Sequence, residues 1–369
     1  MDTSPAGNRL WARVLAWPRG LFAPVVAVAA VAVTACFFPP RMEVFEKKDV
    51  RLHEWARAET FLKQVAEPLR DDVEPAMRWR LLPPLVSKAL GLSPGAALTM
   101  PWLGLLVLMM VLAARLESLT GRRDVALAGT LGFATAGGPV TIVNWLGIND
   151  AWFLLALLET ATGRSRLGLL LAALLGPWVA EHYLIGLPLA LAVRLSLVPE
   201  QKADWRKLLL PVGVGLAPCV GIRLGVTMLR GDPVSAGYLS DMVAVFKFYA
   251  AYVPAGWGMG FRLLWLPLGI ALWLNWRNRE DRPALAAVAS AALLALGAIS
   301  VLAWDLSRSS AIILPLYVLC AAGMAKHDGL RKTWWWCIAG NLCVPYAHIV
   351  GFTVSWNRGP LGLWQWPAS

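Results

Sequence analysis

The stretch "LFAPVVAVAAVAVTACFF", residues 21–38, carries no charged side chain. A helix needs about 20 mostly apolar residues to cross the hydrocarbon layer of a bilayer, so this run predicts a membrane-spanning helix. Basic residues precede this run, and "VTAC", residues 33–36, resembles a lipoprotein-processing box. These two features together are typical of a cleaved signal peptide. The length of the run favours retention as the first span instead.

Similar runs recur along the whole chain. Hydrophobic residues make up 58% of it and charged residues only 15%, where a soluble protein has about a quarter charged. The 20 Trp residues suit the aromatic belts of a membrane protein. The sequence therefore predicts an all-α polytopic bundle, residues 1–369 forming a single integral membrane domain. About eleven spans are expected, near 21–38, 96–114, 125–143, 151–163, 167–179, 183–198, 207–228, 260–276, 283–303, 309–325 and 333–354.

The basic residues fix the predicted orientation. Alternate loops, starting with the N-terminal segment, each carry two or three Lys or Arg residues, whereas the short loops opposite carry fewer. Such a bias marks the cytoplasmic side and predicts an N-in, C-out chain. The pI is about 9.8, but the Lys and Arg residues are scattered over short loops rather than gathered in one patch. A nucleic-acid partner is therefore excluded. The basic positions are Arg9, Arg13, Arg19, Arg115, Arg122, Arg123, Arg164, Arg166, Lys202, Arg206, Lys207, Arg277, Arg279, Arg282, Lys326, Arg331 and Lys332.

Two long outer loops follow from this topology, at 39–95 and 229–259. The first carries nearly equal numbers of acids and bases, so it does not act as an orientation signal. Within it, apolar residues recur at roughly helical spacing between 44 and 69. Such a pattern is typical of an amphipathic helix lying in the plane of the membrane surface.

Several charged or polar residues then fall on the outer face. Charges at membrane depth are costly, so they usually face a cavity or a partner and mark function. Segments far apart in sequence place such residues on one side, which predicts a polar, outward-opening pocket. The residues are Arg78, Arg80, Asp150, Glu181, His182, Asp305 and Arg308.

Each position has a structural alternative. Asp150 is equally suited to cap its helix, and Asp305 is suited to cap a helix or to form a local ion pair with Arg308. Arginines that end the first outer loop are also typical interfacial anchors. Glu159 is expected near the cytoplasmic end in a structural role, and His348 is assigned no role.

Cofactor signatures are absent from the sequence. The five cysteines lie inside apolar runs without CxxC spacing or a nearby His pair, so they predict buried apolar residues and no metal site. No Walker sequence, GxSxG elbow or HExxH motif occurs. ATP-driven pumps and hydrolases of those classes are therefore disfavoured.

Four segments in order resemble bacterial multi-span proteins related to the GT-C superfamily of glycosyltransferases. "RWRLLPPLVSKAL" is similar to their R-x-R-x-L-x-P-x-L segment, and "GINDAWFLLALLETA" to their (T/N)D start of a later span. "EHYLIGLPLAL" is similar to their R-E-x-x-L-x-x-x-P segment, with Ala180 in place of the usual Arg. "DLSRSSAIILPLY" resembles their D-x-S-R-to-Pro segment. The resemblance covers residues from about 40 to 325.

This resemblance implies a transferase of the bacterial inner membrane that uses a polyprenyl-phosphate sugar and works on the extracytoplasmic side. The acceptor would be a glycan, a lipid or a protein, and no cofactor or metal is implied beyond the lipid-linked donor. An acid of the first outer loop would be the general base, with Asp49, Glu46 and Glu43 as competing candidates. The family pattern assigns the phosphate to Arg78, Arg80 and Arg308, and the pocket shape to Asp150, Glu181, His182 and Asp305.

Two other functions remain open from the residues alone. A transporter or flippase for an anionic or lipid-linked solute would use the same pocket, but such folds typically contain broken helices and repeats. No internal repeat is evident in the sequence. The third function is a non-catalytic membrane protein of envelope assembly.

Overall fold

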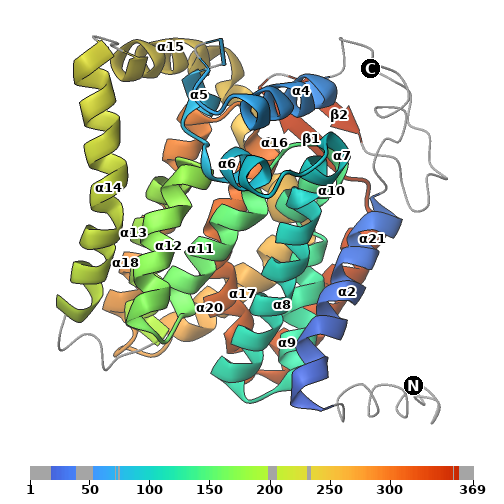
Figure 1. The fold of residues 1–369 in the computed structure, drawn as a ribbon. Helices are drawn as coiled ribbons and strands as arrows, with labels where there is room; N and C mark the ends of the chain where they lie inside the picture. The colour runs from blue at the N-terminus through green and yellow to red at the C-terminus, as the bar shows by residue number, and fades with distance from the viewer. Residues whose placement is uncertain are drawn as a thin grey trace.

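A computed structural model describes residues 18–38, 53–70, 72–73, 75–197, 206–230, 234–351 and 353–356. It is a bundle of helices, in agreement with the expected helical membrane protein (Figure 1). The first half contains α2 (Arg19–Phe37), α4 (His53–Ala66), α5 (Pro75–Arg78), α6 (Leu82–Ala89), α7 (Pro94–Leu98), α8 (Met100–Thr120), α9 (Arg123–Ala134), α10 (Gly137–Asn144), α11 (Asp150–Thr162), α12 (Arg166–Val179) and α13 (His182–Leu197). The second half contains α14 (Arg206–Arg230), α15 (Val234–Tyr249), α16 (Val253–Phe261), α17 (Trp265–Trp276), α18 (Arg282–Leu302), α19 (Leu306–Ser309), α20 (Leu314–Gly323), α21 (Asp328–Cys343), β1 (Ala347–Val350) and β2 (Thr353–Trp356), with short 3₁₀ turns η2 (Ala250–Tyr252), η3 (Arg262–Leu264) and η4 (Ser310–Ile313).

Within the described residues, six helical segments are long and apolar enough to cross a membrane, or seven if one bent pair counts as a span. These segments confirm a multi-pass membrane protein. Other expected spans are shorter: α11 has 13 residues, α12 has 14 and α13 has 16. At 1.5 Å per residue, α11 is only about 20 Å long. The six segments are Gly20–Phe37, Pro94–Thr120, Arg206–Val226, Asp241–Trp276, Arg282–Leu302 and Leu306–Gly323.

A layer of short elements covers the upper end of the bundle in Figure 1, and we call α4–α7, α15 and the β-hairpin the upper layer. Helix α4 buries Ala58, Phe61 and Gln64 on one face, as an amphipathic helix between 39 and 95 should. The second expected loop, 229–259, contains α15 and the start of α16.

The span expected at 125–143 is broken into α9 and α10, which are bent by 57°. Carbonyl groups at such a break lose their helical partners. The buried side chain of Arg262 donates to the carbonyl oxygen of Thr135 at 2.5 Å. It also donates to the carbonyls of Asn341 at 2.7 Å and Val344 at 2.9 Å, near the end of α21. One guanidinium therefore satisfies the backbone of two helix ends.

The last expected span, 333–354, was wrong at its end. Helix α21 stops at Cys343, and Pro345 follows, a residue that cannot continue the helical hydrogen-bond ladder. The next residues form the antiparallel hairpin β1–β2 instead. Gly351 in its turn has a φ of 55°, in the region that glycine adopts without steric cost. The described part of the chain is thus nearly all-α, with one two-stranded sheet.

The described spans differ in how deeply they are buried. In the span window Leu306–Gly323, which covers α19, η4 and α20, 89% of the residues are buried, against 17% for the window in α14. Helix α14 packs chiefly on α12 and stands at the left edge of Figure 1. The segment that carries Arg308 thus forms the centre of the bundle, surrounded by the other helices.

Candidate functional site

Two short turns place the acids of the candidate site under the upper layer. The turn before α11 passes close to α4, and Gly147 there has a φ of 76°. A Cβ at Gly147 would lie 3.1 Å from the Cβ of Phe61, so the close approach requires glycine. Asp150 begins α11 but does not cap it: the N-cap residue is Asn149, and no side-chain cap bond forms.

Asp150 instead faces Arg308 from the other side of the site. Its Oδ2 lies 3.4 Å from Arg308 Nε, and Asp305 Oδ2 lies 2.8 Å from the same nitrogen. Asp305 also caps α19, because its Oδ1 accepts the backbone N–H of Arg308 at 3.1 Å. Asp305 therefore both caps α19 and pairs locally with Arg308, while Asp150 forms a long-range pair with the same arginine. One buried guanidinium is shared by two buried carboxylates.

The C-terminal hairpin holds this cluster from outside. His348 Nε2 lies 3.3 Å from Asp305 Oδ2, and His348 Nδ1 lies 3.2 Å from Ser307 Oγ. The backbone N–H of Ile349 donates to Ser307 Oγ at 3.1 Å, and that of Gly351 donates to the Trp304 carbonyl at 2.6 Å. His348, for which the sequence predicted no role, is thus part of the Asp305 environment. Its contact arises from the hairpin, which no sequence pattern had indicated.

Burial and charge act in opposite directions on Asp305. Burial alone would raise the pKa of its carboxyl, but Arg308 and His348 outweigh burial and lower that pKa to about 2. Asp305 is therefore ionised at physiological pH. Burial raises the pKa of Tyr346 to about 12, so its hydroxyl remains protonated and donates to Ser307 Oγ at 3.2 Å.

A second charged cluster lies between α5–α6 and the α12–α13 connection. Glu181 Oε2 is 3.4 Å from Arg80 Nε, and Glu181 Oε1 is 3.3 Å from Arg223 Nη2. The Arg223 guanidinium lies over the ring of Trp79, 5.3 Å from its centroid. Arg223 sits inside the apolar helix α14, where the sequence offered no motif to identify it. Glu181 is therefore bracketed by two arginines.

A small polar cavity connects these clusters. Its wall includes Arg57, Arg80, Arg308 and Asp150, so three guanidinium groups face one carboxylate. Its volume of about 20 Å³ suits roughly one water molecule. Residues of α4 and α6 also line it, which covers the site on the side of the upper layer. The expected outward-opening pocket is thus nearly closed.

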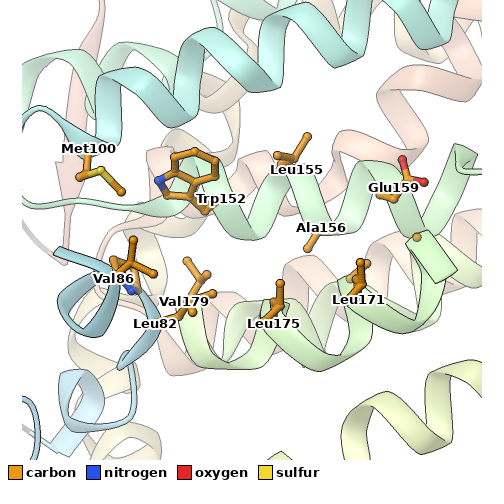
Figure 2. A pocket seen from close by; sticks show the side chains of 14 residues that line it. Leu82, Val86, Met100, Trp152, Leu155, Ala156, Glu159, Leu171, Leu175 and Val179 are labelled. Carbon is orange, nitrogen blue, oxygen red and sulfur yellow. The ribbon is translucent and has the colours of Figure 1, made fainter. Parts of the chain in front are cut away.

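A much larger apolar groove adjoins the polar cavity. It has a volume of about 430 Å³ and runs between α11 and α12, with α6 at one end. Figure 2 shows Trp152, Leu155 and Glu159 along α11 and Leu171, Leu175 and Val179 along α12. Both spaces share Pro83 and Val179 as wall residues.

The remaining expected residues are distributed as follows. His182 is buried, with its ring at 5.7 Å from that of Phe153 in an edge-to-face contact. Arg78, the last residue of α5, is half-buried but does not line the polar cavity. The competing base candidates Asp49, Glu46 and Glu43 lie outside the described residues.

The opposite end of the bundle carries its own ion pairs. Glu159 pairs with Arg115 at 2.5 Å, which is the structural role expected for it. Arg331 Nη1 lies 2.8 Å from Asp124 Oδ2, joining the starts of α21 and α9. These pairs involve the basic residues assigned to the cytoplasmic side. The two ends of the bundle therefore differ in the burial of their ion pairs: Asp150, Asp305 and Arg308 at the upper end are buried, whereas these pairs at the opposite end are partly exposed.

The described residues contain no group of three His, Cys, Asp or Glu side chains that could hold a metal ion. Comparisons of the chain with protein-family models, curated proteins and solved structures give no match. A functional assignment therefore depends on the geometry of the site and on the sequence segments that form it.

Proposed function

We propose that this protein is a glycosyltransferase of the bacterial inner membrane, moving a sugar from a polyprenyl phosphate to a glycan, lipid or protein acceptor outside the cytoplasm. The observation that carries the proposal is the polar cavity, whose wall contains Arg57, Arg80, Arg308 and Asp150 and which lies beside an apolar groove. Guanidinium groups suit phosphate oxygens, and the adjoining groove suits a hydrocarbon tail. Both parts of a lipid-linked phosphate therefore find side chains of matching chemistry, and the polar cavity, which in this structure is sized for one water molecule, widens when the head group binds.

The resemblance to GT-C enzymes supports the roles within this reaction. An acid of the first outer loop, Asp49, Glu46 or Glu43, takes the proton of the acceptor hydroxyl. The hydroxyl oxygen bonds to the anomeric carbon of the sugar, the bond from that carbon to the phosphate oxygen breaks, and the polyprenyl phosphate leaves with the electron pair. Arg80 and Arg308 stabilise the charge that develops on the leaving phosphate. The configuration at the anomeric carbon inverts.

The proposal includes an eleven-span, N-in, C-out topology with the site at the outer face. The basic loops support it, as does the position of the buried site at the end away from the Arg331–Asp124 and Arg115–Glu159 pairs. Helices shorter than a usual span fit this topology because α11 is largely enclosed by other helices and need not face lipid along its length.

Cysteine labelling tests this topology. In a variant without the five native cysteines, Ser93→Cys in the upper layer is expected to react with a membrane-impermeant maleimide added outside whole spheroplasts. Asp328→Cys, at the start of α21, is expected to react only after the membrane is opened. Both side chains are exposed, so access depends on the side of the membrane. The reverse pattern would contradict the proposed orientation.

The catalytic proposal is tested by transfer from defined donors. Purified protein is incubated with polyprenyl-phosphate sugars, and Asp49→Asn, Glu46→Gln and Glu43→Gln are compared with Glu59→Gln. We expect one of the first three changes to lower the rate by roughly 10²- to 10⁴-fold, as loss of a general base does. Glu59 is exposed and pairs with Lys63 on the same helix, so its change should leave the rate unaltered. No turnover with any donor would overturn the proposal.

One observation favours the transporter alternative, namely the broken pair α9–α10, since discontinuous helices commonly line transport sites. In transporters the freed backbone groups bind substrate or ions. Here the Thr135 carbonyl at the break accepts from Arg262. Because the break is occupied by the protein's own side chain, we rank transport second. Solute uptake into proteoliposomes in the absence of sugar transfer would reverse that order.

A further inference from the structure

We propose that Arg223 of α14 is a positioning residue for the polar cavity, because it neutralises Glu181 and thereby leaves the charge of Arg80 available to an anion. This inference rests on the proposed function only in taking that anion to be a phosphate. Three observations carry it: the place of Arg223 in an exposed apolar helix, the way in which Glu181 divides its two oxygens, and the position of Arg80 in the cavity wall.

The first observation is a charged side chain inside an apolar helix at the edge of the bundle. Arg223 lies in α14, and only 17% of the residues in the span window of this helix are buried. Ile222 and Leu224 on either side of it are exposed, whereas Arg223 is half-buried. A charge at membrane depth is costly, so it usually faces a partner and marks function. Arg223 is thus turned from the exposed surface of α14 toward the bundle, where Glu181 lies.

The second observation is the way in which Glu181 divides its two oxygens. Glu181 Oε1 lies 3.3 Å from Arg223 Nη2, and Glu181 Oε2 lies 3.4 Å from Arg80 Nε. The three groups together carry one net positive charge. Without Arg223, Glu181 and Arg80 would carry no net charge, and the carboxylate would oppose an approaching anion. All three side chains are partly buried, where charges interact more strongly than in water.

The third observation is the position of Arg80 between this charged cluster and the polar cavity. Arg80 lines the cavity together with Arg308, whereas Glu181 and Arg223 do not. Its contact with Glu181 uses Nε, and a guanidinium has further N–H donors at its two terminal nitrogens, which suit a phosphate. The Arg223 guanidinium also lies over the ring of Trp79, which directly precedes Arg80. Helix α14 therefore acts on Arg80 both through Glu181 and through the adjoining ring.

The test measures anion binding without any sugar chemistry. Full-length protein in nanodiscs is titrated at low salt with radiolabelled farnesyl phosphate, and with farnesol as the uncharged reference. Arg223→Gln is compared with Arg206→Gln, the same charge change at the exposed start of α14, roughly 25 Å away along the helix. We expect Arg223→Gln to bind farnesyl phosphate at least tenfold more weakly, with Arg206→Gln and all farnesol binding unchanged. Equal binding of farnesyl phosphate by Arg223→Gln and the unaltered protein would overturn the proposal.

A second variant separates this role from simple packing. The double variant Arg223→Gln/Glu181→Gln removes the acid together with the arginine that neutralises it, so the charge of Arg80 is no longer cancelled. We expect its farnesyl phosphate binding to return to within about threefold of the unaltered protein, whereas a packing role would leave both variants equally weak. A folded double variant that stays as weak as Arg223→Gln would overturn the proposal. The expected binding pattern without any sugar transfer would contradict only the proposed reaction.

Discussion

Arg262→Met is expected to lower the free energy of unfolding by about 3 kcal/mol or more. Its guanidinium is the donor to the carbonyls of Thr135, Asn341 and Val344. Removing it leaves three carbonyls at helix ends without this donor, and each unsatisfied buried polar group costs about 1–3 kcal/mol. The measurement is thermal unfolding in a fixed detergent, followed by loss of helical circular dichroism.

A matched control separates burial from simple loss of an arginine. The Arg262 guanidinium lies over the ring of Phe38, 4.8 Å from its centroid. Arg277 likewise lies over an aromatic ring, 4.4 Å from the centroid of Trp273, but it is exposed at the end of α17. Arg277→Met should therefore leave the unfolding temperature nearly unchanged. Equal unfolding temperatures for both variants would show that the three carbonyl bonds contribute little.

The backbone of Arg262 allows a further comparison. Its φ of 50° is rare for a residue other than glycine and costs of order 1–3 kcal/mol. Arg262→Gly relieves that strain but removes the same donor. We expect Arg262→Gly to lower the free energy of unfolding less than Arg262→Met does. The Arg262→Gly protein should still be clearly less stable than the unaltered protein. Equality with the unaltered protein would mean that backbone strain cancels the whole side-chain contribution.

This arginine also illustrates what a sequence can predict about such a chain. Apolar runs and their lengths identified helices and a membrane, because a 20-residue charge-free run has few other uses. They did not predict the break at Thr135 or the role of Arg262, because those depend on side chains that meet across more than a hundred residues. Likewise, the apolar residues of "AHIVGFTVSW" extended the last expected span to 354, although Pro345 ahead of them cannot continue a helical hydrogen-bond ladder.

The charged residues of the site divide in the same way. Topology placed Asp150, Asp305 and Arg308 on one face, and the structure brings them within ion-pair distance. His348 and Arg223 were missed because their partners come from a hairpin and from a peripheral helix, neither of which has a charge pattern of its own. Composition also could not predict that the upper layer closes over the charges, since closure depends on how α4 packs.

Charge counting suggests why Arg308 should matter most to function. It is the only cation within ion-pair distance of both Asp150 and Asp305 among the described residues, so the three groups together carry one net negative charge. A phosphate approaching them is favoured only by the additional guanidinium groups of Arg57 and Arg80 across the polar cavity. Removing Arg308 would change the net charge of the three groups from one negative to two negatives, which opposes the binding of the anion that the proposed function places there.

Arg308→Gln is therefore expected to lower the rate of sugar transfer at least 100-fold. It should also lower the free energy of unfolding by about 3–5 kcal/mol, as breaking a buried ion pair does. The double variant Arg308→Gln/Asp305→Asn restores the original net charge of the cluster, and Asn can still cap α19. Most of the stability should return, while transfer stays lost because the phosphate contact is missing. Transfer and unfolding temperature, measured on the two variants and on Asp305→Asn alone, distinguish the roles. If the double variant regained both, Arg308 would serve only to neutralise Asp305, and the phosphate contact would have to be assigned to Arg57 and Arg80.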